Sequence, residues 1–263
     1  MQKTLTPAER LIVAADFKPP EKVIWTEPGQ YPGTSVICQS KRAWVKRQVL
    51  ALADSLKGTG VYLKVNSALR ACGYDLIGEI QSRGLKVFAD LKLIDIGETL
   101  STDRAFLKEA KPELLTVMCV SGLNAMQALK AELPDTEVLG VTVLTSLTED
   151  ETYTMFGTCI DVAVAKLADL GERAGIDGFI CSPKEVAMLR SRISSTRTLN
   201  TPAIRPSWAI VPGDDQNPER IMTPAKAIKY GADRIVVGRP IIQSASPYDA
   251  VMRTIAEIAS ATP

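Results

Sequence analysis

The chain has 263 residues, of which 46% are hydrophobic and 23% charged, so it is long enough to bury a large core. Its net charge of +1 argues against nucleic acid or a membrane surface as a partner, because neither sign of charge dominates. No apolar run reaches the roughly 18 residues that span a bilayer, and no long apolar segment follows Met1, so we expect neither a membrane helix nor a signal peptide.

Two residue types narrow the chemistry. The five cysteines are odd in number and far apart and include no Cys-x-x-Cys, which predicts reduced thiols in a cytoplasmic protein and argues against a zinc ribbon. Histidine is absent from the sequence, which removes Ser–His and Cys–His nucleophile pairs and histidine metal ligands. Proton transfer must therefore fall to Lys, Asp, Glu, Tyr or Cys.

Short apolar runs alternate with helical patterns along the chain. The first run, 11–16, ends in Asp16 and is typical of a buried strand. Prolines and glycines break the segment 17–39, which predicts a long insertion without regular structure. Further strands are predicted at 61–65, 87–92, 114–120, 138–144, 178–181 and 234–239, and a seventh strand is predicted to end at 201–205. Helices are predicted at 40–58, 67–84, 100–110, 122–132, 158–172 and 223–230, and also from Ser182 and from Pro247 onward.

Eight strands, each followed by a helical pattern, predict a (β/α)8 barrel that forms a single domain over residues 1–263. A doubly wound open sheet is the alternative. That fold usually has a glycine-rich turn after its first strand, whereas this chain has Asp16-Phe17-Lys18-Pro19 there. The barrel is therefore favoured.

Charged residues end the third predicted strand, in the pattern Asp90-x-Lys92-x-x-Asp95. Residues two apart in a strand share a face, so Asp90 and Lys92 are expected to point the same way. Burying them is costly unless they pair or act on a ligand, and the spacing alone leaves both readings open. The barrel favours a site, because its active sites gather at the carboxyl ends of the strands. Polar residues at those ends are Asp16, Lys64, Asp90, Lys92, Thr145, Arg205 and Arg239.

The last strand suggests the class of ligand. Gly238-Arg239 follows it, and the loops after the seventh and eighth strands commonly hold phosphate in this fold. Glycine allows the backbone to approach an anion, and arginine supplies a planar fork of donors. Gln216, in the Pro- and Gly-rich loop 206–221, is a candidate amide clamp on a closing lid.

The sequence resembles the orotidine 5′-phosphate decarboxylase family from about residue 11 to 247. The resemblance rests on Asp90-x-Lys92-x-x-Asp95-Ile96-Gly97-x-Thr99, Ile204-Arg205-Pro206, Gly213-Asp214-Asp215-Gln216, Arg220-Ile221-Met222-Thr223-Pro224 and Val236-Val237-Gly238-Arg239-Pro240-Ile241. Ala15-Asp16 and Leu63-Lys64-Val65 fit the first two strands of the family pattern.

The resemblance implies decarboxylation of orotidine 5′-phosphate to UMP without a metal or cofactor, in a homodimer with shared active sites. Lys92 would donate a proton to C6 of the pyrimidine, and Asp90 would lie against the departing carboxylate. Asp95 would enter from the partner subunit to complete an array with Lys64, Asp90 and Lys92. The resemblance assigns further substrate contacts to Asp16 and Lys64 (ribose), Thr145 with Ser146 as its alternative (pyrimidine), Ile96, Thr99 (across the dimer interface), and Arg205, Gln216, Gly238 and Arg239 (phosphate).

The chain also departs from the family pattern. The insertion 17–39 is longer than expected, and a plain surface insertion is favoured over the alternatives that it covers the pocket, extends the dimer contact or binds another molecule. Ala203 stands where the family usually has glycine, and 207–211 is unusually apolar for a lid. Alternatives are a sister enzyme acting on sugar phosphates, such as a metal-dependent hexulose-phosphate synthase or a ketogulonate-phosphate decarboxylase, and a non-catalytic nucleotide-binding barrel. An orotate phosphoribosyltransferase is a further candidate partner.

Overall fold

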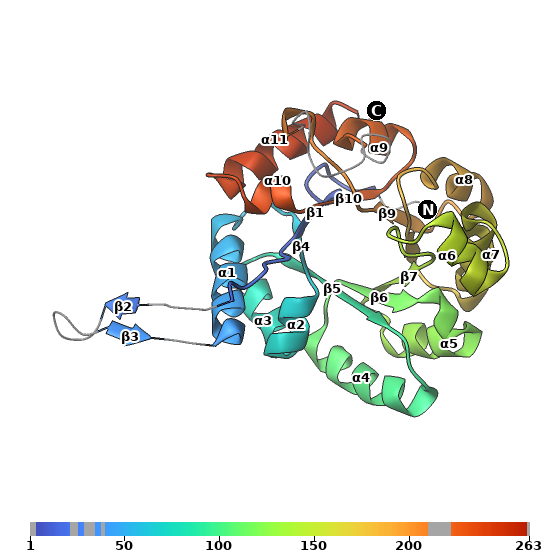
Figure 1. Ribbon diagram of the computed structural model, residues 1–263, viewed down its shortest axis with the longest axis horizontal. Coiled ribbons are helices and arrows are strands. Elements are labelled where there is room, and N and C mark those ends of the chain that lie inside the picture. Colours follow the sequence, from blue (N-terminus) through green and yellow to red (C-terminus); the bar gives the residue numbers. More distant parts are fainter. Residues whose placement is uncertain (1–3, 22–25, 29–34, 38–39, 210–221, 262–263) are drawn as a thin grey trace.

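The computed structural model describes residues 4–21, 26–28, 35–37, 40–209 and 222–261. Eight parallel strands close into a barrel in the order β1-β10-β9-β8-β7-β6-β5-β4, with helices around the outside (Figure 1). The barrel strands are β1 (Leu11–Ala14), β4 (Tyr62–Val65), β5 (Lys86–Leu93), β6 (Leu114–Met118), β7 (Glu137–Val141), β8 (Gly178–Ile180), β9 (Thr198–Thr201) and β10 (Arg234–Val237). The predicted (β/α)8 fold is confirmed.

The helices connect consecutive strands, as parallel pairing requires. They are α1 (Lys41–Ser55), α2 (Ser67–Cys72), α3 (Asp75–Gln81), α4 (Gly97–Ala110), α5 (Leu123–Glu132), α6 (Glu149–Phe156), α7 (Ile160–Ala174), α8 (Val186–Arg192), α9 (Pro224–Lys229), α10 (Arg239–Ile242) and α11 (Pro247–Ala259), with short 3-10 turns η1 (Cys119–Ser121) and η2 (Ser207–Ala209). Among the described residues, no helix has the length and apolar character that crossing a membrane requires.

Helix starts follow local chemistry. Ser40 caps α1 by accepting a hydrogen bond from the Ala43 N–H, and Thr223 caps α9 in the same way, with Pro224 in the first turn. The predicted helix start at Ser182 is wrong. Ser182 and Glu185 instead form a hydrogen-bonded turn, and α8 begins only at Val186.

Two apolar layers build the core. The larger lies between the outer face of the barrel and the helices and includes Leu11, Leu63 and Val87. The smaller fills the barrel interior with Ile12, Ala14, Tyr62, Phe88, Leu114, Leu139 and Val236. These inward side chains make the barrel a packed core, and they form a floor beneath its carboxyl end.

Two expectations about the chain path need correction. The segment 17–39 is not wholly irregular, because β2 (Thr26–Pro28) and β3 (Ser35–Ile37) pair as an antiparallel ribbon that extends away from the barrel (Figure 1). The seventh barrel strand was predicted to end at 201–205, but it spans Thr198–Thr201 and so ends at the first of these residues. Pro202 has no N–H for a strand ladder, and beyond it, in the described part of this segment, a single bridge joins Ile204 to Met222.

Candidate active site

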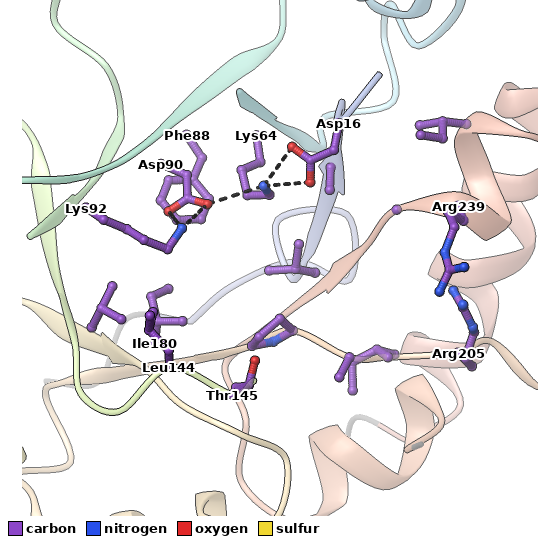
Figure 2. Close-up of a pocket in the computed structure, with 18 of the residues that line it drawn as sticks. Asp16, Lys64, Phe88, Asp90, Lys92, Leu144, Thr145, Ile180, Arg205 and Arg239 are labelled. Atoms are coloured by element: carbon purple, nitrogen blue, oxygen red, sulfur yellow. Dashed lines mark hydrogen bonds and ion pairs between the residues drawn. The ribbon is translucent and has the colours of Figure 1, made fainter. Parts of the chain in front are cut away.

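One pocket of about 480 Å³ opens at the carboxyl ends of the strands. It collects most of the site residues expected from the sequence, although they come from different strands (Figure 2). These residues are Asp16, Lys64, Asp90, Lys92, Thr145, Arg205, Gly238 and Arg239. Ser146, the weaker alternative to Thr145, is not among the pocket residues.

Four alternating charges form a continuous chain on one side of the pocket. Lys64 Nζ lies 2.9 Å from Asp16 Oδ2 and 3.3 Å from Asp90 Oδ2. Lys92 Nζ donates to both oxygens of Asp90, at 2.7 and 2.8 Å. The order Asp16–Lys64–Asp90–Lys92 places each ammonium against a carboxylate, so the repulsion between like charges is offset within the array.

Asp90 is the buried centre of this array, with only 6% of its surface exposed. Burial raises its pKa, but the charges of Lys64 and Lys92 and hydrogen bonds from Lys92 and Thr116 outweigh burial, so its pKa is lowered overall. Asp90 is therefore ionised at neutral pH. Lys64 is also buried, whereas Lys92 is partly exposed to the pocket.

The local geometry of β5 differs from the regular strand that the sequence predicts. Lys92 has a φ of +50°, in the left-handed region, and the register with β6 shifts between Ala89 and Leu93. Asp90 and Lys92 do meet in the pocket, but through an irregularity in the strand and not through simple alternation. Such backbone conformations cost roughly 1–3 kcal/mol and occur preferentially at functional sites.

Two arginines lie on the other side of the pocket (Figure 2). Arg205 is buried and follows the Ile204–Met222 bridge, where its N–H donates to the Met222 carbonyl. Arg239 begins α10 directly after β10. Ala203 also lines the pocket and has a φ of +61°, a conformation that favours glycine.

Between the charge array and the arginines, the pocket is mostly apolar. Phe88, Ile180 and Val236 form part of its wall, and Thr145 and Leu144 border it at the end of β7. A Cβ built on Gly238 would lie 3.5 Å from the Ala14 Cβ, which is ordinary contact, so packing does not itself demand glycine there. The pocket can thus hold a flat apolar ring between a charged centre and a basic end.

Several predicted residues are not brought into this pocket. Asp95, Ile96 and Thr99 are exposed beyond the end of β5 and do not line it. The Asp95 carboxylate instead accepts a hydrogen bond from the Ile96 N–H at 2.7 Å. Gln216 lies outside the described residues, as do 210–211 of the proposed lid segment.

Two polar neighbours of Asp90 were not predicted from the sequence. The Thr116 hydroxyl donates to Asp90 Oδ1 at 3.0 Å, and Asn66 Nδ2 lies 3.4 Å from Oδ2. A signal existed for both, because Thr116 interrupts an apolar strand and Asn66 directly follows one. No cluster of three or more His, Cys, Asp or Glu side chains suited to a metal ion occurs among the described residues.

Known proteins resemble this chain over most of its length. A model of the orotidine 5′-phosphate decarboxylase / HUMPS family matches residues 9–254. Orotidine 5′-phosphate decarboxylase of Pseudomonas fluorescens strain Pf0-1 is 36% identical over 220 residues, which cover 80% of this chain and 91% of the relative. The enzyme of the same name from Staphylococcus haemolyticus is 41% identical over 183 residues, covering 67% of this chain and 78% of the relative.

Solved structures share the fold. The crystal structure of orotidine 5′-phosphate decarboxylase from Lactobacillus acidophilus has a TM-score of 0.71 at 24% identity, covering 95% of this chain and 99% of that one. An uncharacterized conserved protein from Geobacillus kaustophilus has a TM-score of 0.71 at 25% identity, covering 94% of this chain and 99% of that one. By sequence match over nearly its whole length, the chain belongs to the orotidine 5′-phosphate decarboxylase / HUMPS family.

Proposed function

We propose that this protein decarboxylates orotidine 5′-phosphate to UMP and carbon dioxide, the last step of de novo pyrimidine nucleotide synthesis. The observation that carries the proposal is the Asp16–Lys64–Asp90–Lys92 array, which faces a basic pocket end across an apolar gap. Curated relatives named orotidine 5′-phosphate decarboxylase support it. This reaction requires a site that binds a nucleotide phosphate and stabilises negative charge on a ring carbon.

Lys92 is the proposed proton donor. When the bond from C6 to the carboxylate breaks, its electron pair stays on C6 as a carbanion that the ring delocalises poorly. A fixed ammonium beside that carbon stabilises the charge without reorganisation at the moment of reaction. Lys92 can then transfer its proton to C6, which suits a chain without histidine.

Asp90 has two proposed roles. It holds the Lys92 ammonium in place through contacts of 2.7 and 2.8 Å. Its lowered pKa keeps it anionic, so a substrate carboxylate bound beside it would be repelled, and loss of carbon dioxide would relieve that repulsion. Both effects favour the transition state over the bound substrate.

The remaining pocket residues are proposed to hold the nucleotide. Asp16 and Lys64 would bind ribose hydroxyls, and Thr145 the pyrimidine. Arg205, Gly238 and Arg239 would bind the phosphate together with Gln216. Phosphate contacts far from C6 can supply binding energy that is used at the transition state.

A homodimer with shared sites belongs to the same proposal. Asp95 and Thr99 lie outside their own chain's pocket, and Ile94 and Ile96, on either side of Asp95, are 57% and 73% exposed. Large exposed apolar side chains beside a charged one are typical of a surface that packs against another chain. Asp95 of one subunit would complete the array of the other.

We further propose that residues 1–263 act as one catalytic domain, with 17–39 as a surface insertion. The pairing of β1 with β10 supports this, since it joins the two ends of the chain in one barrel. A cytoplasmic location is part of the proposal, and the free thiols of the described cysteines are compatible with it, because that compartment keeps thiols reduced. An association with an orotate phosphoribosyltransferase, whose product is the proposed substrate, would be tested by copurification.

The family name also covers HUMPS enzymes, so a sugar phosphate is the second candidate substrate. The position of Lys64 between Asp16 and Asp90 favours the nucleotide, because we expect a sister enzyme to lack this lysine. An absorbance assay on orotidine 5′-phosphate in excess EDTA separates the two. Turnover in EDTA supports the proposal, whereas magnesium-dependent activity on a sugar phosphate alone contradicts it.

Lys92→Ala tests the mechanism. We expect it to lose nearly all turnover, by at least about 1,000-fold, while it remains folded and binds UMP, because the proton donor and the charge stabiliser are both removed. Circular dichroism and UMP titration check the fold and the site. Decarboxylation by Lys92→Ala at the wild-type rate would refute this role.

A further inference from the structure

We propose that Thr116 is a positioning residue that holds Asp90 and Lys92 in their reactive geometry. The inference rests on the proposed decarboxylation and adds a residue to it. Thr116 lies on β6, is fully buried and does not line the pocket, so it acts only through its neighbours.

The Thr116 hydroxyl joins the two reactive residues. It donates to Asp90 Oδ1 at 3.0 Å and accepts the backbone N–H of Lys92 at 2.9 Å. A backbone N–H can only donate, so the hydroxyl oxygen is the acceptor in that contact. The hydroxyl hydrogen is therefore free to form a hydrogen bond to Asp90, whose carboxylate oxygen accepts it.

The position of Thr116 follows from the irregularity in β5. Ala89 pairs with Leu115 and Leu93 pairs with Val117, so Asp90, Leu91 and Lys92 stand opposite Thr116 alone. The backbone of one residue cannot provide regular strand hydrogen bonds to three residues of the neighbouring strand. The threonine side chain instead supplies the acceptor for the Lys92 N–H, at the residue whose φ is +50°.

A separate hydrogen bond holds Leu91, the residue before Lys92 in the irregular part of β5. Arg70 donates to the Leu91 carbonyl at 2.7 Å. Thr116 is therefore the contact that couples the strained backbone of Lys92 to the carboxylate that orients its ammonium. Its loss would let the Lys92 side chain move relative to C6 of a bound substrate, and displacements of about 1 Å in a reacting group can cost roughly 100-fold in rate.

Thr116→Val keeps the shape of the side chain and removes both hydrogen bonds, whereas Thr116→Ser keeps the hydroxyl. Thr254→Val is the matched control, since it removes an equally buried hydroxyl that bonds the Ala250 carbonyl within α11. Thr116→Ala replaces the valine variant if that chain does not fold. Wild type is assayed first on orotidine 5′-phosphate.

We expect Thr116→Val to lower kcat by roughly 10- to 100-fold with KM changed by less than about threefold, because it removes a hydrogen bond to the charged Asp90 together with the acceptor of the Lys92 N–H. Thr116→Ser should stay within about threefold of wild type, and Thr254→Val should turn over normally. Wild-type kcat in Thr116→Val, or equal losses in the serine and valine variants, would overturn the proposal.

A second measurement does not depend on turnover. The carboxyl carbon of Asp90, followed by NMR against pH, should titrate at higher pH in Thr116→Val than in wild type or Thr116→Ser, because a hydrogen bond to the ionised form is lost. The charged groups that face Asp90, Lys64 on β4 and Lys92 on β5, are unchanged in all three proteins. If wild type does not decarboxylate orotidine 5′-phosphate, the proposed function fails, and this titration still decides the role of Thr116. The same Asp90 titration in wild type and Thr116→Val would overturn the proposed role of Thr116.

Discussion

Asp90 is the residue on which the charge array depends, because it is the only carboxylate in the described part of the chain that contacts both Lys64 and Lys92. Without it, two neighbouring ammonium groups would repel each other, with a single remaining carboxylate, Asp16, on the far side of Lys64. Its ionisation is thus coupled to folding as well as to chemistry.

This coupling predicts a pH dependence. The folded-state pKa of Asp90 is below its ordinary value of 3.8, so the stability that it contributes is fully present above 3.8 and is lost as pH falls through the lower, folded value. Asp90→Asn should lower the free energy of unfolding by about 1–3 kcal/mol at pH 7. The difference in the free energy of unfolding between wild type and Asp90→Asn should stay constant down to pH 5. The other carboxylates titrate in both proteins, so their contributions cancel in this difference.

Urea denaturation at a series of pH values measures that difference. A gap that narrows between pH 7 and pH 5 would mean that burial, and not the two lysines, controls the pKa of Asp90. The contacts at 2.7–3.3 Å argue against this outcome.

At the scale of the elements, the loop after β9 carries backbone strain beside the pocket. Ala203 has a φ of +61°, and its side chain is exposed. Left-handed backbone costs a residue with a Cβ roughly 1–2 kcal/mol more than glycine, while glycine gains freedom in the unfolded chain worth about 0.4–1 kcal/mol. We therefore expect Ala203→Gly to raise the free energy of unfolding by about 0.5–1 kcal/mol.

The matched control is Ala51→Gly, an exposed alanine in the middle of α1, which should lower the free energy of unfolding by about 1 kcal/mol. Both are measured by urea denaturation. Destabilisation of similar size in the two variants would show that the loop at Ala203 stores no strain.

The elements also show what sequence can predict. Hydrophobic runs located most barrel strands, and the ends of those strands located the charge array, because parallel strands in a barrel end on one face. The end of the seventh strand was predicted too late and its start was not located, because its inward residues, Thr198 and Asn200, are polar and bond Arg234 inside the barrel. Apolar periodicity cannot detect such a strand.

The details of the site could not be predicted for a related reason. The irregularity in β5 depends on which residue of β6 stands opposite, and no local pattern in Asp90-Leu91-Lys92 specifies that register. Thr116 is distant in sequence and becomes important only after the strands pair. The residues at the pocket were predictable, but the contacts that hold them were not.

At the scale of the whole molecule, the opposite end of the barrel carries a second, structural set of charges. Arg234 begins β10 and is fully buried, with its guanidinium 2.7 and 2.8 Å from the carboxylate oxygens of Glu137, the first residue of β7. Asn200 accepts a further hydrogen bond at 3.1 Å. In this fold the amino-terminal face serves stability and not catalysis.

Glu137→Gln should therefore lower the free energy of unfolding by about 3–5 kcal/mol, because it leaves a buried guanidinium without its counter-charge. The kcat of the folded variant should equal that of wild type. Asp169→Asn is the control, since its pair with Arg192 is exposed and should be worth less than about 1 kcal/mol. Equal losses in the two variants would show that burial of the pair is not what matters.

The proposed dimer predicts that two inactive variants regain activity when they are mixed. Lys92→Ala and Asp95→Ala chains should each be inactive alone, because each lacks one member of the shared site. In a mixed dimer, one pocket combines Lys92 of the Asp95→Ala chain with Asp95 of the Lys92→Ala chain and is intact, while the other pocket lacks both. Random exchange of subunits in a twofold dimer should then restore about a quarter of wild-type activity. Exchange is followed independently with differently tagged chains, and no recovery after exchange is complete would place Asp95 outside the neighbouring pocket.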